Sequence, residues 1–494
     1  MAIDTGIATD FEVVIGLEVH SQLLTKSKMF CTCSTDYAYA APNTHVCPIC
    51  MGMPGVLPVI NEQAVAYTIM TALALNCEIP AYSKFDRKNY PYPDLMKGYQ
   101  ISQYDVPLSK NGYLTIEHNG QVKRIGITRV HLEEDTARLL HRDGYSLVDI
   151  NRSGTPLMEI VSEPDMRSPE EARLYMQTLR EILVYLGVSS GRMEEGSLRC
   201  DANISVRPRG QQKLGVKSEI KNMNSFRSVE RALAYEAQRQ IELLQNGQPI
   251  YQETRGWVET KGITVPQRSK EYAHDYRYFP EPDLPPLLIS RAWVEELRAQ
   301  LPELPDARRA RYVDEYGLSA QDANVLTEEK ALGDYFEQVV AASQTSDRKA
   351  RAKAAANLVL NDVVRLLKNS SISIQESPLS PAASANLLEL LEKERITGKQ
   401  AKEVLEEAFA SGNMPDVIVK EKGIEPPISD LGVLERIIEE VIANNSKAVS
   451  DYRAGKTNAL QRLKGEVMKQ TRGQAKPDSV QTILIAKLDE TPTS

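Results

Sequence analysis

The chain has 494 residues, of which 42% are hydrophobic and 26% charged, and this composition excludes a wholly disordered or collagen-like chain. At roughly 100–200 residues per domain, the length predicts two to four domains. The formal net charge of -8 argues against a general nucleic-acid binder, although it leaves room for a basic face on one domain.

The N-terminal residues carry neither a basic segment nor an apolar one that would form a signal peptide. No apolar stretch approaches the ~20 residues that cross a bilayer. We therefore expect a cytoplasmic protein that does not enter a membrane.

Residues 10–290 mix strand and helix patterns. FEVVIGLEVHSQL, from Phe11, alternates apolar and polar side chains as a half-buried strand does, and Asn119-Gly120 predicts a hairpin turn. A helix is expected to begin after Ser168, with Pro169 in its first turn, and to end near Gly187. Further strand patterns follow, so this part predicts an α+β domain.

Helical periodicity dominates after the proline-rich segment at 278–290. A last helical unit begins after Ser411-Gly412. We therefore expect three domains: the mixed domain at 1–294, an all-helical domain at 295–411 and a small helical tail at 412–494.

Four of the six cysteines form two close pairs, Cys31-x-Cys33 and Cys47-x-x-Cys50. Four thiolates in two such pairs suit tetrahedral zinc, and a closed four-thiolate shell favours a structural role over a catalytic one. Four unmetallated cysteines in a reducing compartment are the alternative, which this spacing disfavours.

Carboxylates and histidines gather in three other segments. Glu18 and His20 lie two residues apart in a predicted strand and so point to the same face, as half of a divalent-cation site or as a surface pair. HLEED at 131–135 places Glu133 beside two further acidic residues, which repel unless a cation or a basic group neutralises them. Glu159 lies in an apolar strand, where a carboxylate requires a metal ion or a salt bridge, for example to Arg152.

Polar residues alternate with apolar ones in SLRCDANISV and KSEIKNMNS, and this predicts a polar sheet face that can form the floor of a cleft. These residues are Arg199, Asp201, Asn203, Glu219, Lys221 and Asn222. The chain contains no P-loop and no GxGxxG motif, so any use of ATP must proceed without them. A GxSxG elbow is also missing, which disfavours a serine hydrolase.

The segment from Lys447 to Lys476 contains eight basic residues against Asp451 and Glu466. Contact with a phosphate backbone and a solvated helix face are equally good interpretations of this run taken alone.

These strings occur together in one known family. IGLEVHSQL, SKFDRKNYPYPD, GYQISQ, HLEEDTARL, LVDINRSGTPLMEIVSEPD, EEGSLRCDANISVRP, EIKNMNSF and HDYRYFPEPDLPPL resemble the B subunits of the glutamyl/aspartyl-tRNA amidotransferases, from about residue 11 to the C-terminus. DxNRxGxPLxE is the most specific of these signatures. The chain departs from the family pattern at Met96, where proline is expected.

The resemblance implies a ligase. The family acts on tRNA that carries glutamate in place of glutamine, or aspartate in place of asparagine. The glutaminase of the complex, its A component, releases ammonia from glutamine. The B component uses ATP and Mg²⁺ to phosphorylate the side-chain carboxylate, which ammonia then converts to the amide. The implied partners are the A and C components, the misacylated tRNA, and a non-discriminating aminoacyl-tRNA synthetase.

The resemblance also implies residue roles and a fold. Glu18, His20, Glu133 and Glu159 fall on the family's catalytic magnesium ligands, and Arg199, Asp201 and Lys221 lie in matching strings as candidate substrate or phosphate contacts. Some relatives lack the cysteine quartet, which favours structural Zn²⁺ at Cys31, Cys33, Cys47 and Cys50. The implied fold is a glutamine-synthetase-like cradle with an antiparallel sheet, followed by a helical domain and a tail that grip tRNA. A non-catalytic tRNA-binding scaffold is the main alternative, and a zinc-dependent hydrolase is a weaker one.

Overall fold

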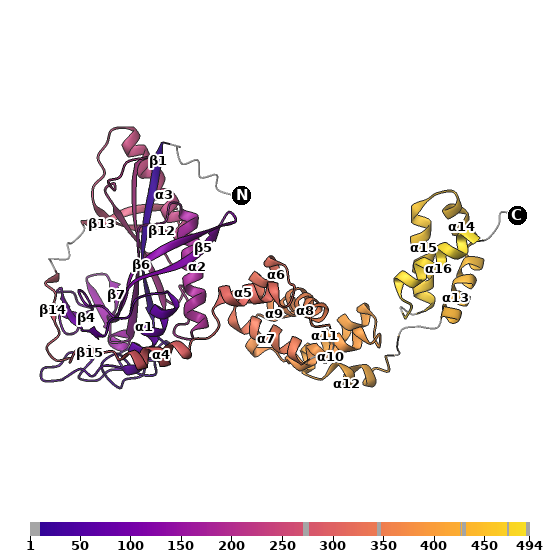
Figure 1. Cartoon of the computed structure of the whole chain (residues 1–494), viewed down its shortest axis with the longest axis horizontal. Helices are drawn as coiled ribbons and strands as arrows, with labels where there is room; N and C mark the ends of the chain where they lie inside the picture. The colour runs from indigo at the N-terminus through magenta and orange to yellow at the C-terminus, as the bar shows by residue number, and fades with distance from the viewer. Residues whose placement is uncertain are drawn as a thin grey trace. The chain divides into compact units, whose positions relative to one another are not determined.

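The computed structural model describes residues 10–269, 276–342, 347–424, 426, 431–471 and 474–490. The chain divides into two compact units, Met1–Pro305 and Asp306–Ser494, which Figure 1 shows as a sheet-containing part and a helical part. The predicted α+β class is therefore confirmed, with an N-terminal sheet domain followed by helices.

The strands all belong to the first unit. They are β1 (Phe11–Gln22), β2 (Tyr82–Ser83), β3 (Asp86–Asn89), β4 (Tyr99–Ser102), β5 (Ser109–His118), β6 (Gln121–Glu134), β7 (Arg138–Arg142), β8 (Tyr145–Asp149), β9 (Pro156–Ser162), β10 (Leu198–Pro208), β11 (Ser218–Lys221), β12 (Glu253–Val258), β13 (Ile263–Ser269), β14 (Phe279–Pro280) and β15 (Leu287–Leu288).

The helices occupy both units. In the first unit they are α1 (Glu62–Ala74), α2 (Pro169–Tyr185), α3 (Phe226–Gln245) and α4 (Arg291–Ala299). The later helices are α5 (Pro305–Asp314), α6 (Ala320–Glu328), α7 (Lys330–Ala341), α8 (Arg348–Asn357), α9 (Val364–Ser370), α10 (Pro381–Glu392), α11 (Gly398–Ser411), α12 (Pro415–Glu421), α13 (Leu431–Asn444), α14 (Ser446–Arg453), α15 (Thr457–Gln470) and α16 (Pro477–Glu490). A π-helical segment, Leu358–Val363, joins α8 to α9.

An eight-stranded sheet forms the centre of the first unit, in the order β13-β12-β11-β10-β1-β9-β6-β5. All its neighbouring strands are antiparallel except β11 and β12, which run parallel. β1 lies between β9 and β10, so its side chains meet those of two strands that are distant in sequence.

One face of this sheet is apolar and is covered by helices. Val13, Ile15, Leu17 and Val19 of β1 are buried in the same core as residues of α1, α2 and α3, such as Ile69, Leu179 and Leu233. The alternate positions of β1 are mostly polar and lie on the opposite face. The strand predicted from Phe11 is therefore confirmed. Its apolar side chains point into the core, and the polar side chains between them point to the opposite face of the sheet.

Local signals in the sequence were also correct. Asn119 and Gly120 both adopt positive φ, at 52° and 73°, between β5 and β6, as the short hairpin turn requires. The Ser168 hydroxyl accepts a hydrogen bond from the Glu171 amide at 3.1 Å and so caps α2.

Helix α4 packs on the first core. Val294 and Leu297 of α4 are buried there, and the first compact unit continues to Pro305. Ile418 and Val419 of α12 likewise belong to the second core, beyond the expected boundary at 411. A third core, from Leu434 to Leu488, is formed by α13 to α16. Among the described residues, no helix is long and apolar enough to span a membrane.

Candidate active site and cysteine cluster

The polar face of the large sheet brings together residues from β6, β9, β1 and β10. The pairing register places His20 opposite Glu159 on one side and opposite Arg199 on the other. His131 is also opposite Glu159, and Glu18 is opposite Asp201. The polar rows predicted from separate sequence segments therefore form one continuous face.

Three of the predicted magnesium ligands meet at the centre of this face. His20, Glu133 and Glu159 each offer a ligand atom, and these atoms lie within 4.8 Å of one another. His20 Nε2 is 3.6 Å from Glu133 Oε1 and 3.5 Å from Glu159 Oε2. Two carboxylates and one imidazole are a donor set that fits a small divalent cation.

Glu18 lies beside this group but is not part of it. It is two residues from His20 on the same face, as predicted, and its carboxylate accepts a hydrogen bond from Asn203 Nδ2 at 2.9 Å. It also lines a cavity of about 260 Å³ together with Gly16, Val161 and Lys217. Its role as a metal ligand stays a prediction.

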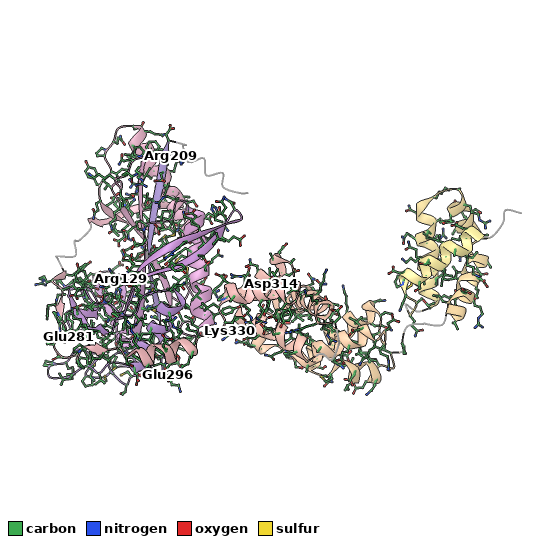
Figure 2. The ribbon with its side chains drawn as sticks, in the orientation of Figure 1. Arg129, Arg209, Glu281, Glu296, Asp314 and Lys330 are labelled. Carbon is green, nitrogen blue, oxygen red and sulfur yellow. The ribbon has the colours of Figure 1, made fainter. Side chains whose placement is uncertain are left out.

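A second histidine, His131, belongs to the site and was overlooked as a ligand candidate. Its Nε2 is 3.2 Å from Glu159 Oε2 and 3.8 Å from Glu133 Oε2, and it is almost fully buried. Arg129 Nε lies 3.3 Å from His131 Nδ1, and Figure 2 labels Arg129 on the sheet. The alternation of HLEED on a strand was the signal that could have found it, since it puts His131 and Glu133 on one face.

The charges at the site compensate one another. Burial lowers the pKa of His20, but hydrogen bonding to Glu159 and the charge of Glu133 outweigh burial and raise that pKa to about 9. Burial would raise the pKa of Glu159, but His131 and His20 hold it well below its usual value. Burial would also raise the pKa of Glu133, but hydrogen bonding to His131 helps to hold it below its usual value. Both carboxylates are therefore anionic at neutral pH, as metal ligands must be, whereas the His20 imidazole must lose its proton before it can bind a cation.

Lys88 adds a positive charge from the small sheet β14-β3-β4. Its Nζ lies over the ring of Tyr276 at 5.0 Å, and in the described part of the chain it pairs with no carboxylate at contact distance. Burial would lower its pKa, but Tyr278, Glu133 and Glu159 raise it. Lys88 is therefore a charged ammonium that interacts electrostatically with these carboxylates, a role that the sequence pattern of FDRKNYPYPD did not reveal.

The acidic residues of HLEED do not share one site. Glu133 reaches the histidines and accepts a hydrogen bond from Ser102 Oγ at 3.1 Å. Glu134 pairs with Lys97, and Asp135 pairs with Arg199 and, at 3.7 Å, with Arg152. Each of the three carboxylates thus has its own basic partners, so their charges are neutralised separately. Arg152 neutralises Asp135, while Glu159 is paired with histidines.

The candidate substrate contacts lie on the same polar face but are already paired. Arg199 is bound to Asp135, and Lys221 pairs with Asp201 and lies 3.5 Å from Glu219. Asn222 departs from the predicted row because it has a φ of 66° and follows the end of β11. Contact of Arg199, Asp201 and Lys221 with substrate stays a prediction.

The four predicted cysteines form a separate cluster. Ligand atoms of Cys31, Cys33, Cys47 and Cys50 lie within 4.8 Å of one another, and all four are free thiols. Cys50 Sγ is 3.9 Å from Cys47 Sγ and accepts a hydrogen bond from the Cys47 amide at 3.1 Å. A hydrogen bond from Cys31, together with the charge of Lys28, lowers the pKa of Cys50 to about 4. Four converging sulfurs with a stabilised thiolate fit a zinc ion.

The fold combines an antiparallel-rich sheet domain with a polar, carboxylate-bearing face. Comparison with known proteins identifies the family to which this domain belongs. Residues 13–295 match the model described as the GatB/GatE catalytic domain, and residues 334–488 match the GatB domain. The chain belongs to this GatB/GatE family.

Full-length relatives share one name, which is that of the B subunit of the aspartyl/glutamyl-tRNA(Asn/Gln) amidotransferase. The chain is 58% identical to the protein of that name from Carboxydothermus hydrogenoformans over 484 residues, covering 97% of this chain and 99% of the relative. It is 56% identical over 483 residues to the one from Moorella thermoacetica, covering 97% and 100%. It is 54% identical over 491 residues to the one from Dehalococcoides mccartyi, covering 98% of this chain and 100% of the relative.

Proposed function

We propose that this chain is the ATP-using component of a tRNA-dependent amidotransferase, a ligase that forms a carbon–nitrogen bond with glutamine as amide donor. The substrate is the side-chain carboxylate of glutamate on tRNA(Gln) or of aspartate on tRNA(Asn). A carboxylate oxygen attacks the γ-phosphorus of ATP and ADP leaves. Ammonia then attacks the acyl carbon, phosphate leaves and the nitrogen loses a proton. The names of the relatives support this substrate and a complex of several subunits, in which we assign the A and C components as partners.

The observation that carries this proposal is the convergence of His20, Glu133 and Glu159 on the polar sheet face. These side chains would hold Mg²⁺, which when bound neutralises charge on the triphosphate and on the attacking carboxylate. Ser102 and His131 orient Glu133 and Glu159 through the contacts given above. Lys88 supplies a further positive charge toward the transferred phosphoryl group.

Conversion of glutamyl-tRNA to glutaminyl-tRNA by the reconstituted complex tests this proposal. The chain is combined with its partner subunits, ATP and Mg²⁺, and supplied with either glutamine or ammonium chloride. We expect Gln-tRNA and stoichiometric ADP from either nitrogen source. Product without ATP consumption would contradict the proposed phosphorylation. A complex whose activity did not depend on His20, Glu133 and Glu159 would favour the non-catalytic scaffold.

We propose a structural Zn²⁺ at the cysteine cluster. The four thiols supply the usual shell of a structural zinc site, and such a shell leaves no coordination position for a reacting water. This argues against a zinc-dependent hydrolase. Full occupancy by one zinc ion per chain, measured by elemental analysis, is the expected result.

We further propose that an exposed helical ridge contacts the tRNA backbone. On α8, the π-helical segment and α9, polar side chains with mostly four-residue spacing face solvent: Lys349, Lys353, Asn357, Asn361, Arg365 and Lys368. In an α-helix, residues four apart are rotated slightly past one full turn, so a row with this spacing winds gradually around the helix. The wider π-helical turn rotates the row in the opposite sense, and these side chains therefore stay on one side of the helical segment. Over nineteen residues at 1.5 Å each, the ridge extends about 28 Å.

The ridge has few internal counter-charges. Arg365 lies 3.8 Å from Asp362 and 3.3 Å from Glu406, whereas Lys349, Lys353 and Lys368 form no ion pair with the described residues. In the tail, by contrast, part of the basic run is paired, since Lys456 contacts Asp451 at 2.8 Å and Lys469 contacts Glu466 at 3.9 Å. Unpaired lysines favour phosphate contact, because binding then breaks no ion pair.

Reversing two charges on this ridge should weaken tRNA binding. For Lys353→Glu/Lys368→Glu we expect an affinity loss of about tenfold or more, and a slope of log K against log salt that is smaller by about two. Fluorescence anisotropy with labelled tRNA at several salt concentrations measures both. Lys399→Glu/Lys402→Glu on α11 is the control, since it changes net charge equally from exposed positions off the ridge. Equal losses in both variants would show a general charge effect and contradict a role of the ridge.

A further inference from the structure

Lys28 is a buried cation without a carboxylate partner among the described residues. It lies after β1, and its side chain is 0% exposed. Its Nζ donates hydrogen bonds to two backbone oxygens, of His45 at 2.8 Å and of Ile150 at 3.4 Å. Among the described residues, no carboxylate forms an ion pair with it. A lysine is almost never fully buried unless its charge is compensated, so an anion is needed close by.

The cysteine cluster follows this lysine in the chain and lies beside it in space. The amide of Lys28 donates to the Cys33 oxygen at 2.9 Å, and its ammonium binds the oxygen of His45, two residues before Cys47. A Cβ atom placed on Gly154 would lie 3.5 Å from Lys28 Cδ and 3.7 Å from Cys50 Cβ. The lysine stem and Cys50 therefore pack against the same glycine, and Lys28 lies next to both cysteine pairs.

We propose that Lys28 is the counter-ion of the metal–thiolate cluster and increases its affinity for zinc. This inference rests on the zinc site proposed above. Four thiolates around one Zn²⁺ leave an excess of two negative charges, and of the four sulfur ligands Cys50 is buried while the other three are partly exposed. A buried ammonium compensates part of that excess, and the cluster in turn supplies the anion that Lys28 lacks.

The same lysine connects the cluster to the catalytic face. Ile150, whose oxygen it binds, begins the short turn Ile150–Arg152, and Gly154 binds the Met29 amide through its oxygen at 2.6 Å. β9, which carries Glu159, starts at Pro156, directly after this turn. Lys28 is thus a positioning residue that ties the metal-binding loop to the strand of a catalytic carboxylate.

Zinc affinity of full-length variants tests the charge of Lys28. Lys28→Met removes charge and hydrogen bonds, and Lys28→Gln removes the charge but keeps an N–H donor. In competition with a chromophoric chelator, we expect both variants to bind zinc about 10-fold or more weakly than the parent chain. Lys26→Met is the matched control, since Lys26 is exposed two residues away, and it should bind zinc as the parent does.

Thermal unfolding supplies a second readout that does not depend on activity. Trp257 and Trp293 are the two tryptophans of the chain and both lie in the first unit, so tryptophan fluorescence follows this unit alone. We expect Lys28→Met to lower the Tm more with zinc bound than with chelator present. A lysine that only hydrogen-bonds two carbonyls would instead give the same loss in both conditions.

The outcomes separate the two proposals. Parent-like zinc affinity in Lys28→Gln, or equal Tm losses with and without zinc, would overturn the counter-ion proposal while leaving the zinc site standing. A parent chain without zinc, and without the thiolate absorption of bound cobalt, would overturn the zinc site and the counter-ion together. The amidation proposal would survive either result, because it rests on His20, Glu133 and Glu159.

Discussion

Replacing Glu159 by glutamine should reduce ATP-dependent amidation of glutamyl-tRNA by on the order of 10³-fold. The side chain keeps its size, but it loses the negative charge that, together with Glu133 and His20, would hold the metal ion. Glu133→Gln should have a similar effect. Affinity for tRNA should stay within about twofold, because the backbone contacts that dominate binding lie elsewhere. Single-turnover amidation assays and tRNA titrations measure the two quantities.

Glu117→Gln is the matched control for these variants. Glu117 is exposed on β5 at the edge of the sheet, so its replacement should leave both rate and affinity unchanged. If Glu133→Gln and Glu159→Gln amidated at the parent rate, the carboxylates would not take part in phosphorylation. If they lost tRNA affinity to the same extent as rate, the defect would lie in substrate binding.

Asp135→Asn should lower the free energy of unfolding of the first unit by about 3 kcal/mol. This is at the lower end of the loss expected when one partner of a buried ion pair is removed, because Arg199 and Arg152 are partly exposed. Asp135 is 2% exposed and also accepts a hydrogen bond from Gln22 Nε2 at 2.7 Å. One carboxylate thus connects residues of β1 and β10 with the end of β6 and the turn before β9. Urea unfolding followed by tryptophan fluorescence measures the loss.

The pH dependence of this loss has a defined sign. Burial would raise the pKa of Asp135, but Arg199 and Arg152 hold it below its usual value of 3.8. A lowered pKa stabilises the folded state above about pH 4, and this contribution disappears as the pH falls through the folded-state value. The difference between parent and variant should therefore be constant near neutral pH and shrink below pH 4. Asp143→Asn, at an exposed position, is the matched control.

The pieces of the site were predictable from sequence, but their assembly was not. Alternation in GLEVH placed Glu18 and His20 on one face, because the side-chain period of a strand is independent of its partners. The pairing of His20 with Glu159 depends on the register between β1 and β9, which are separated by more than a hundred residues. Only the family resemblance brought these segments together before the structure did.

Residues to which the resemblance assigned no role were missed for physical reasons. Lys88 lies on a short strand of a separate small sheet, and nothing in DRKN indicates that the ammonium interacts electrostatically with Glu133 and Glu159. Lys28 looks like an ordinary surface lysine in TKSKMF, and only its burial distinguishes it from Lys26. The packing of α4 on the first core was not visible either, because an amphipathic helix does not reveal in its sequence which neighbour it packs against.

The position of β1 between β9 and β10 makes the assembly of the candidate site depend on correct strand alignment. A slip of one residue along either neighbour would turn His20 toward the helices and bring Val19 to the polar side. The same error would bury an imidazole and expose four aliphatic side chains of the core. Misaligned molecules would consequently be unstable and would lack the proposed metal site, so quality control that removes poorly folded chains would also remove chains without that site.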